Sequence, residues 1–351
     1  MLEVRTFTDG GQRAVDVARD IASFLGEARQ SLQLAHYDFN LGDETAAIVA
    51  GELRAAVGRG IAVRVIYNVD HRNPIPVPPP PEPDAQLIGS LGGDSRAIAG
   101  VPDLMHHKYV VRDSETVWTG SMNWTDDSFS RQENVVAVAE SAALAGRFHA
   151  DFEELWTTGL VEQSGFVDTS PVDLGGQKIR PWFTPGNGPA LSNRIAKAIL
   201  RAQRRVRVAS PVVTAAPVLA ALAQAQSEGR IDLGGVVDQA QIGGVIYQWG
   251  VNGNRSWKLP LLMRALASNF SAKQSNPWRP EGGVHDFMHA KVTVADDVVF
   301  LGSFNLSRSG ELNAENVLEI EDAGLADRLA AFVEDIRGRY SPVALEEAVP
   351  A

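Results

Sequence analysis

The chain has 351 residues, of which 44% are hydrophobic and 21% are charged, and these proportions suit a globular protein with a sizeable core. It contains no cysteine, which excludes disulfides, thiol nucleophiles and cysteine-based metal sites. The formal net charge of -11 argues against a basic coat for general nucleic-acid binding, although a local basic channel remains compatible. No signal-peptide pattern and no stretch of ~20 apolar residues is present, so we expect a cytoplasmic location.

The first half of the chain predicts alternating helices and strands. After "FTDGG" at Phe7, residues 21–40 change from the apolar spacing of a helix to β-forming residues. Residues 52–68 repeat this order, with a glycine that ends the helix before the strand. Such a series indicates an α/β domain with a mixed or parallel sheet. The proline-rich segment from Asn73 to Asp84 interrupts the series and predicts an extended surface loop.

A string of chemically active residues follows, "MHHKYVVRDSETVWTGSMNWT" from Met105. His106 and Lys108 are two residues apart and would share one face of a strand. The turn at "RDSE" predicts a β-hairpin that brings Ser121 and Asn123 beside them. His107 would face the other side of its strand, and we expect it to be structural.

The second half repeats the first half in order. The segment Thr169–Pro189 is rich in glycine and proline and predicts a linker between domains at 1–168 and 190–351. "FTPGN" at Phe183 matches "FTDGG", and the two helix-to-strand segments recur at 195–214 and 221–238. The spacing between copies drifts by a few residues only, as insertions in loops would produce.

A second copy of the active string, "MHAKVTVADDVVFLGSFNLS", begins at Met288. A glutamate lies ten residues beyond the asparagine of each copy, and each glutamate is followed by Asn-Val. A carboxylate at a fixed distance is a candidate to hold each imidazole in one tautomer. One such string alone would be weak evidence, because a lone histidine is more often structural, but two matched copies indicate a functional site. The second copy contributes His289, Lys291, Asp296, Ser303, Asn305 and Glu315, and the equivalents in the first are His106, Lys108, Asp113, Ser121, Asn123 and Glu133.

Between these copies, residues 239–287 form an insertion with five basic residues, two acidic residues and several aromatics. Cations beside aromatics suit stacked bases and backbone phosphates, and they equally suit a lipid head group at a membrane surface. A helical excursion whose aromatics pack in the core is the structural alternative. The candidate substrate-binding residues in it are Trp249, Arg255, Trp257 and Lys258.

The two strings resemble the His-x-Lys-(x)4-Asp-(x)6-Gly-Ser-x-Asn signature of the phospholipase D superfamily. The first matches fully, and the second has five residues before the glycine, so that Asp296 or its neighbour Asp297 could fill the aspartate position. The resemblance covers about residues 5–340. It implies a duplicated α/β fold with two halves about a pseudo-twofold axis, mixed sheets, and one active site built from both strings.

The resemblance also implies a division of roles. One histidine forms a covalent phosphohistidine and the other is the general acid and base, with His106 expected as nucleophile and His289 as acid. Lys108, Lys291, Asn123 and Asn305 would hold the phosphate oxygens, with Ser121 and Ser303 in support. Glu133 and Glu315 would orient the imidazoles, and Asp113 and Asp296 would act structurally.

The motif defines the reaction class and leaves the substrate open. We expect a metal-independent phosphodiesterase without cofactor, since lysines already supply positive charge. Two unlike halves in one acidic chain favour a phospholipid substrate, cleaved by water or transferred to an alcohol, with transient membrane contact and no obligate protein partner. A nuclease of the same superfamily, or a non-catalytic lipid- or nucleic-acid-binding protein, are the alternatives.

Overall fold

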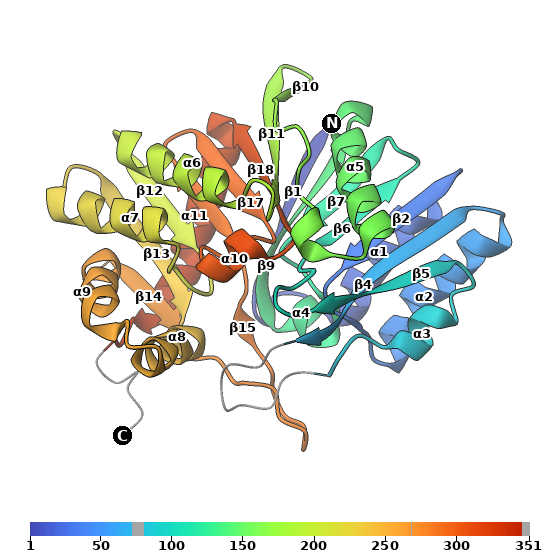
Figure 1. The fold of residues 1–351 in the computed structure, drawn as a ribbon, viewed down its shortest axis with the longest axis horizontal. Coiled ribbons are helices and arrows are strands. Elements are labelled where there is room, and N and C mark those ends of the chain that lie inside the picture. The colour runs from blue at the N-terminus through green and yellow to red at the C-terminus, as the bar shows by residue number, and fades with distance from the viewer. Residues whose placement is uncertain (72–80, 268, 346–351) are drawn as a thin grey trace.

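The computed structural model describes residues 1–71, 81–267 and 269–345 as two α/β halves that lie side by side (Figure 1). The elements of the first half are β1 (Leu2–Phe7), α1 (Ala14–Gly26), β2 (Ser31–His36), β3 (Phe39–Asn40), α2 (Asp43–Gly58), β4 (Ala62–His71), α3 (Ala85–Gly89), β5 (Asp94–Gly100), β6 (Lys108–Arg112), β7 (Thr116–Gly120), β8 (Trp124–Thr125), α4 (Asp126–Ser130), β9 (Gln132–Glu140), α5 (Ala142–Thr158) and the 3-10 helix η1 (Val161–Gln163).

The second half repeats this order, with the two helices α8 and α9 in the place of α3. Its elements are β10 (Val172–Leu174), β11 (Gln177–Thr184), α6 (Gly188–Arg201), β12 (Arg205–Ala209), α7 (Ala216–Glu228), β13 (Asp232–Asp238), α8 (Gln239–Val251), α9 (Arg255–Leu266), β14 (Phe270–Lys273), β15 (Phe287–Met288), β16 (Val292–Ala295), β17 (Val298–Gly302), α10 (Arg308–Leu312), β18 (Glu315–Glu321), α11 (Ala323–Arg339) and β19 (Ser341–Pro342).

Each half is built on one mixed sheet, and the two sheets have the same strand order. The first runs β1-β9-β7-β6-β2-β4-β5, and the second contains β11-β18-β17-β16-β12-β13-β14 in the equivalent places. The pairs β2–β4 and β12–β13 are parallel, whereas β6–β7 and β16–β17 are antiparallel hairpins. The duplicated α/β fold expected from the repeats is therefore confirmed, and so is the hairpin that carries each active string.

Helices α5 and α11 lie between the sheets and share one hydrophobic core with both of them. The two helices begin alike, because the side chains of Ser141 and Asp322 each accept a hydrogen bond from a backbone N–H in the first turn. Separate clusters pack α1 and α2 on the outer face of the first sheet, and α6 and α7 on the outer face of the second. The shared central core joins the halves into one body.

The segment predicted as a linker, Thr169–Pro189, is part of the second sheet instead. It contains β10 and β11, and β11 pairs antiparallel with β18 along six residues from Ile179 to Thr184. Its glycines form the turn of the β10–β11 hairpin, where Gly175 and Gly176 have φ of 63° and 91°. A glycine-rich turn between two short strands resembles a linker in composition, which explains the error. Most of the predicted proline-rich loop, residues 73–80, lies outside the described residues.

One strand crosses between the halves. The short strand β15 stands directly before the second active string and pairs in parallel with β9 of the first half, with Phe287 opposite Gln132 and Met288 opposite Glu133. This pairing brings the second string beside the first sheet. Among the described residues, no helix is both long enough and apolar enough to cross a membrane.

Candidate active site

The two active strings occupy equivalent places at the edge where the halves meet. His106 precedes β6, and Asn123 follows β7 across the hairpin; His289 and Asn305 stand in the same relation to β16 and β17. The glycine before each serine is required by packing. A Cβ on Gly120 would lie 2.1 Å from the Val135 carbonyl oxygen of the neighbouring strand β9, which no side chain tolerates.

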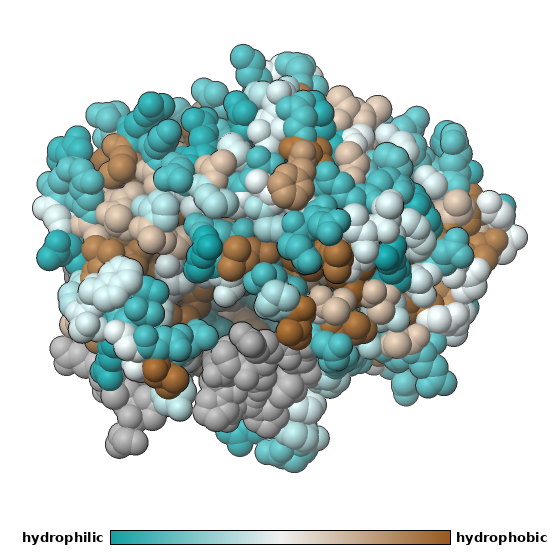
Figure 2. Space-filling model, in the orientation of Figure 1, coloured by the Kyte–Doolittle hydropathy of each residue, from teal (hydrophilic) through white to brown (hydrophobic). Residues whose placement is uncertain are grey.

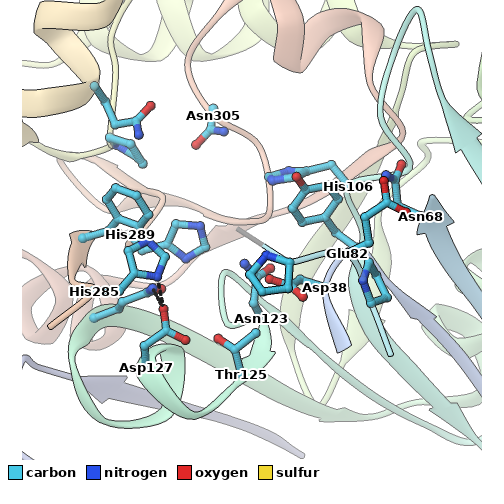
Figure 3. A pocket seen from close by; sticks show the side chains of 17 residues that line it. Asp38, Asn68, Glu82, His106, Asn123, Thr125, Asp127, His285, His289 and Asn305 are labelled. Carbon is cyan, nitrogen blue, oxygen red and sulfur yellow. Dashed lines mark hydrogen bonds and ion pairs between the residues drawn. The ribbon is translucent and has the colours of Figure 1, made fainter. Parts of the chain in front are cut away.

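Both histidines and both asparagines of the strings line one cavity of about 250 Å³ between the halves (Figure 3). The two strings therefore meet at a single site, as their duplication predicts. Residues of both halves line the rest of the cavity, and these are Tyr37, Asp38, Asn68, Pro81, Glu82, Pro83, Thr125, Asp127, Gln132, Pro211, Gln241, His285 and Phe287.

The two imidazoles are held at their Nδ1 atoms. His106 Nδ1 is 2.8 Å from Glu315 Oε2 of the opposite half, and His289 Nδ1 is 3.1 Å from Asn134 Oδ1 of the opposite half. An oxygen acceptor at Nδ1 places the ring hydrogen there, which leaves the lone pair on Nε2 for attack or proton transfer. Each histidine is thus oriented by a residue from the other copy of the repeat.

Lys108 and Lys291 contact the backbone of the two histidines and are the source of positive charge at the site. Lys108 Nζ and Lys291 Nζ each donate to the backbone carbonyl of the histidine two residues earlier, at 2.6 and 2.7 Å. Burial lowers the pKa of Lys108 to about 7, and burial together with the charge of Lys108 lowers the pKa of Lys291 well below its usual value. A phosphate anion in the cavity would raise the pKa of both lysines and so hold them charged.

The same groups control the histidines. Burial, followed by the lysine charges, lowers the pKa of His106 and of His289 well below the ordinary value, so both rings are neutral at pH 7. Burial raises the pKa of Glu315 to about 7, although the charge of Lys108 opposes this shift. A neutral imidazole whose Nδ1 hydrogen meets a carboxylate is suited to nucleophilic attack through Nε2.

Glu133 does not contact His289, contrary to the role predicted for it. Its carboxylate lies 3.1 Å from the ammonium of Lys273, which is 2% exposed, and accepts a hydrogen bond from the Tyr340 hydroxyl. The buried ammonium needs a carboxylate to offset its charge, so Glu133 turns toward β14, and the neighbouring Asn134 contacts the histidine instead. Of the two motif histidines, therefore, His106 is paired with a carboxylate and His289 with an amide oxygen.

The two serines support strands β9 and β18 from beneath the site. Ser121 Oγ donates to Asn134 Oδ1 at 2.7 Å and accepts from the Val135 N–H at 3.0 Å. Ser303 Oγ accepts from the Asn316 N–H at 3.0 Å. They thus fix the segments that carry the residues oriented against the imidazoles.

The motif aspartates lie away from the cavity. Asp113 accepts hydrogen bonds from the backbone N–H groups of residues 29–31, at 2.7 to 2.9 Å, and Asp296 does the same for residues 203–205, at 2.7 to 3.0 Å. These bonds depress the pKa of both carboxyls against the effect of partial burial. The expectation of a structural role agrees with this geometry, and Asp297 pairs with Arg204 at the surface instead.

We predict that Asp113→Asn costs about 1 to 2 kcal/mol of unfolding free energy and leaves turnover unchanged. Asparagine tolerates the left-handed backbone at this position, where φ is 55°, so the loss reports the missing acceptor oxygen. Because the folded pKa of Asp113 is depressed, its contribution is present above the unfolded value near 3.9 and is lost as pH falls. Denaturant unfolding at pH 7 and pH 3 tests this: the gap to wild type should narrow in acid, while Asp297→Asn should change little at either pH.

The four residues of the insertion predicted to bind substrate do not line the cavity. Trp249 is buried in the outer core of the second half, and Trp257 is 58% exposed on α9. The ammonium of Lys258 lies over both indole rings, 5.2 and 5.1 Å from their centres. Helix α9, which carries Arg255, Trp257 and Lys258, packs against α7.

Other cavity residues were missed from the sequence. Asp38, Asp127, Gln132 and His285 line the cavity but belong to no repeated string. The nearest signal was the closeness of His285 to His289 in "GVHDFMH". Within the described residues, no group of three or more His, Asp or Glu side chains is arranged to hold a metal ion.

Comparisons with known proteins give a family and a fold. Residues 21–156 and 195–337 match the family described as "Cardiolipin synthase, PLD-like domain". The mitochondrial cardiolipin hydrolases of Xenopus laevis and Mus musculus are each 28% identical, over 141 and 135 residues, or 40% and 37% of this chain. The matches span 60% and 53% of those relatives, which is less than two thirds of their length.

A solved structure covers more of the chain. The crystal structure of phosphatidylserine synthase from Haemophilus influenzae Rd KW20 superposes with a TM-score of 0.63 over 96% of this chain and 86% of that one. At 14% identity, this likeness concerns the fold alone. It spans both halves, including the edge where the two strings meet.

Proposed function

Because this chain belongs to the phospholipase D superfamily, we propose that it is a phosphodiesterase that cleaves a phospholipid through a covalent phosphohistidine. The observation that carries the proposal is the pair of imidazoles on one cavity, each with Nδ1 bound to an oxygen and Nε2 left for reaction. Two such rings can divide the work of breaking one phosphodiester and forming another bond at the same phosphorus.

In the first step, His106 Nε2 attacks phosphorus and the bond to the leaving alcohol breaks. The electron pair of that bond goes to the alcohol oxygen, which takes the proton from Nε2 of protonated His289. The attacking ring of His106 becomes a positively charged phosphoimidazolium, and Glu315, 2.8 Å from its Nδ1, offsets this charge. The phosphodiester anion favours the proton on His289, because it offsets the lysine charges that depress its pKa.

In the second step, His289 is neutral and takes a proton from water or an alcohol. The oxygen attacks phosphorus, the phosphorus–nitrogen bond breaks, and His106 returns to the neutral form while His289 is protonated again. Lys108 and Lys291 offset the charge on the non-bridging oxygens, and the amides of Asn123 and Asn305 line the cavity where those oxygens would lie. The incoming oxygen decides whether the result is hydrolysis or transfer.

A phospholipid substrate is supported by the activities named for the similar proteins, which are cardiolipin hydrolase and phosphatidylserine synthase. The test is an assay of the purified chain on mixed phospholipid vesicles and on single- and double-stranded nucleic acid. We expect release of a head group or exchange of the alcohol, with nucleic acid left intact. Cleavage of nucleic acid with intact lipids would replace this proposal by the nuclease alternative.

We predict that a chelator changes the rate by less than about twofold, because two lysines already supply the positive charge that phosphoryl transfer requires. The experiment compares initial rates before and after dialysis against EDTA, with EDTA-treated enzyme supplemented with Mg²⁺ or Ca²⁺ as the control. A rate that disappears with EDTA and returns only with the divalent ion would contradict a metal-free mechanism.

We also propose that α8 and α9 contact an anionic membrane surface. Residues 239–266 contain three basic residues and no acidic one, although the chain has a net charge of -11. Tyr247, Val251, Trp257 and Met263 are exposed there, and Figure 2 shows hydrophobic patches on the surface in this region. Aromatics beside cations suit the interface of an anionic bilayer.

Contact of α8 and α9 with a membrane predicts that a variant of this surface binds anionic vesicles more weakly. Trp257→Ala with Lys258→Ala should weaken sedimentation with phosphatidylglycerol vesicles by about tenfold, since it removes one aromatic anchor and one cation. Turnover on a short-chain soluble phosphodiester should stay the same. The matched control is the removal of exposed cations in α6, Lys197→Ala with Arg201→Ala, and equal losses in both variants would contradict a role for the α8–α9 surface.

A further inference from the structure

One wall of the cavity is rich in acidic and acceptor groups that the proposed mechanism does not use. Asp38 and Asp127 line it together with the amide of Gln132. In Figure 3, Asp38, Thr125 and Asp127 lie on the side of the histidines away from Asn305. Neither Lys108 nor Lys291 is among the residues that line the cavity, although the charge of Lys108 acts on Asp38.

Two acceptor atoms of this wall have no hydrogen-bond partner among the described residues. Gln132 is 2% exposed, its Nε2 donates to Asp127 Oδ2 at 3.2 Å, and its Oε1 is unpartnered. Asp38 Oδ1 is also buried and unpartnered. A buried acceptor left without a donor costs ~1–3 kcal/mol, and a ligand that supplies donors removes this cost.

Asp127 is fixed in place beside these acceptors. Its Oδ2 lies 2.5 Å from His285 Nδ1, and the ring of His285 packs edge-on against Phe287 with centroids 4.7 Å apart. Burial and then the negative charge of Asp127 raise the pKa of Asp38 to about 8. A cation between the two carboxyls would relieve that repulsion and return Asp38 to the ionised form.

We propose that this wall binds the alcohol portion of the substrate and selects a head group that carries a primary ammonium, with Asp38 and Gln132 as the specificity-determining residues. A primary ammonium offers both a positive charge for the acidic side chains and N–H donors for the two unpartnered acceptors. A glycerol head group offers donors without the charge. Choline offers the charge without donors, and the ring of Tyr37 that could face it already lies 4.8 Å from the ammonium of Lys108.

The inference rests on the proposed phospholipid activity and is tested by comparing three lipids in matched vesicles. Phosphatidylethanolamine supplies charge and donors, phosphatidylglycerol supplies donors, and phosphatidylcholine supplies charge. We expect kcat/KM for the ethanolamine lipid to exceed that for each of the others by about tenfold or more. Equal values for all three, or a preference for the choline or glycerol lipid, would overturn the inference while the phosphodiesterase activity stands.

Two variants test the hydrogen-bond acceptor and the negative charge separately. Gln132→Met keeps the volume and removes the acceptor, so it should lower the ratio of ethanolamine to choline lipid about tenfold. Asp38→Asn removes the charge, so it should lower the ratio of ethanolamine to glycerol lipid by a similar factor. The controls are the exposed residues Gln163 and Asp43, replaced in the same way, which should leave both ratios unchanged.

The outcomes separate the role of this wall from the proposed activity on phospholipids. If Gln132→Met does not fold, the ratio measured with Asp38→Asn decides. Ratios that stay at the wild-type value in the folded variants would overturn the role of this wall. No cleavage of any of the three lipids would overturn the proposed function, and the inference with it.

Discussion

Replacement of His106 by alanine is expected to lower turnover on a natural phosphodiester by about four orders of magnitude or more and to abolish covalent labelling by substrate phosphate. The loss follows because His106, whose Nδ1 is held by the Glu315 carboxylate, is the proposed nucleophile, whereas Nδ1 of the other motif histidine, His289, faces an amide oxygen. The adduct should be trapped by rapid denaturation without acid and located by mass spectrometry. Phosphate on His289 in the wild type, with none on His106, would reverse the assignment.

The partner variant His289→Ala should behave differently, and it serves as the matched control. Loss of the acid slows the departure of a poor alcohol, but an activated leaving group such as p-nitrophenol needs little protonation. The first step should therefore return in part with that substrate, and the phosphohistidine should accumulate because the base for the second step is missing. Product formation without any adduct, in the wild type and in both variants, would count against a covalent route.

Glu315→Gln is expected to lower kcat/KM by about 10² to 10⁴, because the carboxylate both fixes the His106 tautomer and offsets the charge that the ring gains. The measurement is kcat/KM on a soluble phosphodiester, with Glu321→Gln, exposed at the end of the same strand, as the control. A variant with wild-type kcat/KM would contradict the orientation of His106 by Glu315.

The pH profile gives a second test of the same carboxylate. Glu315, with a pKa of about 7, is ionised above that pH, and Lys108, also near 7, is charged below it, so the wild-type profile should be bell-shaped near neutrality. The glutamine variant should lose the acidic limb. Its alkaline limb should move to lower pH, because the charge of Glu315 raises the pKa of Lys108. An unchanged acidic limb would exclude Glu315 as its source.

The sequence predicted the order of helices and strands because this order produces repeating patterns of residues. Apolar spacing, glycine stops and the two copies of the string each constrain many residues at once, and the fold obeys all of them. Thr169–Pro189 was misread because its composition is that of a turn-rich segment, whereas its pairing with β18 is a long-range contact that composition does not encode. The same reason hid the strand β15, which is two residues long and pairs across the halves.

Within the site, the sequence predicted both histidines and both asparagines that line the cavity, and it missed Asp38 and Gln132. The repeat placed a glutamate at equal distance from both strings, but only Glu315 reaches a histidine. Glu133 pairs instead with Lys273 of β14, a residue that belongs to neither copy of the active string. Asp38 and Gln132 lie at the ends of strands, where one residue can matter without any periodic neighbour to reveal it.

The bond between His106 and Glu315 joins residues that are 209 positions apart in the chain. A ribosome that has synthesised the first 314 residues has already made both histidines and both lysines of the site, yet the group that orients the nucleophile has not been added. Strand β18 must also leave the exit tunnel before it can pair with β17 and bring Glu315 to the ring. The nascent chain therefore lacks the group that orients His106 until Glu315 has been added and β18 has paired.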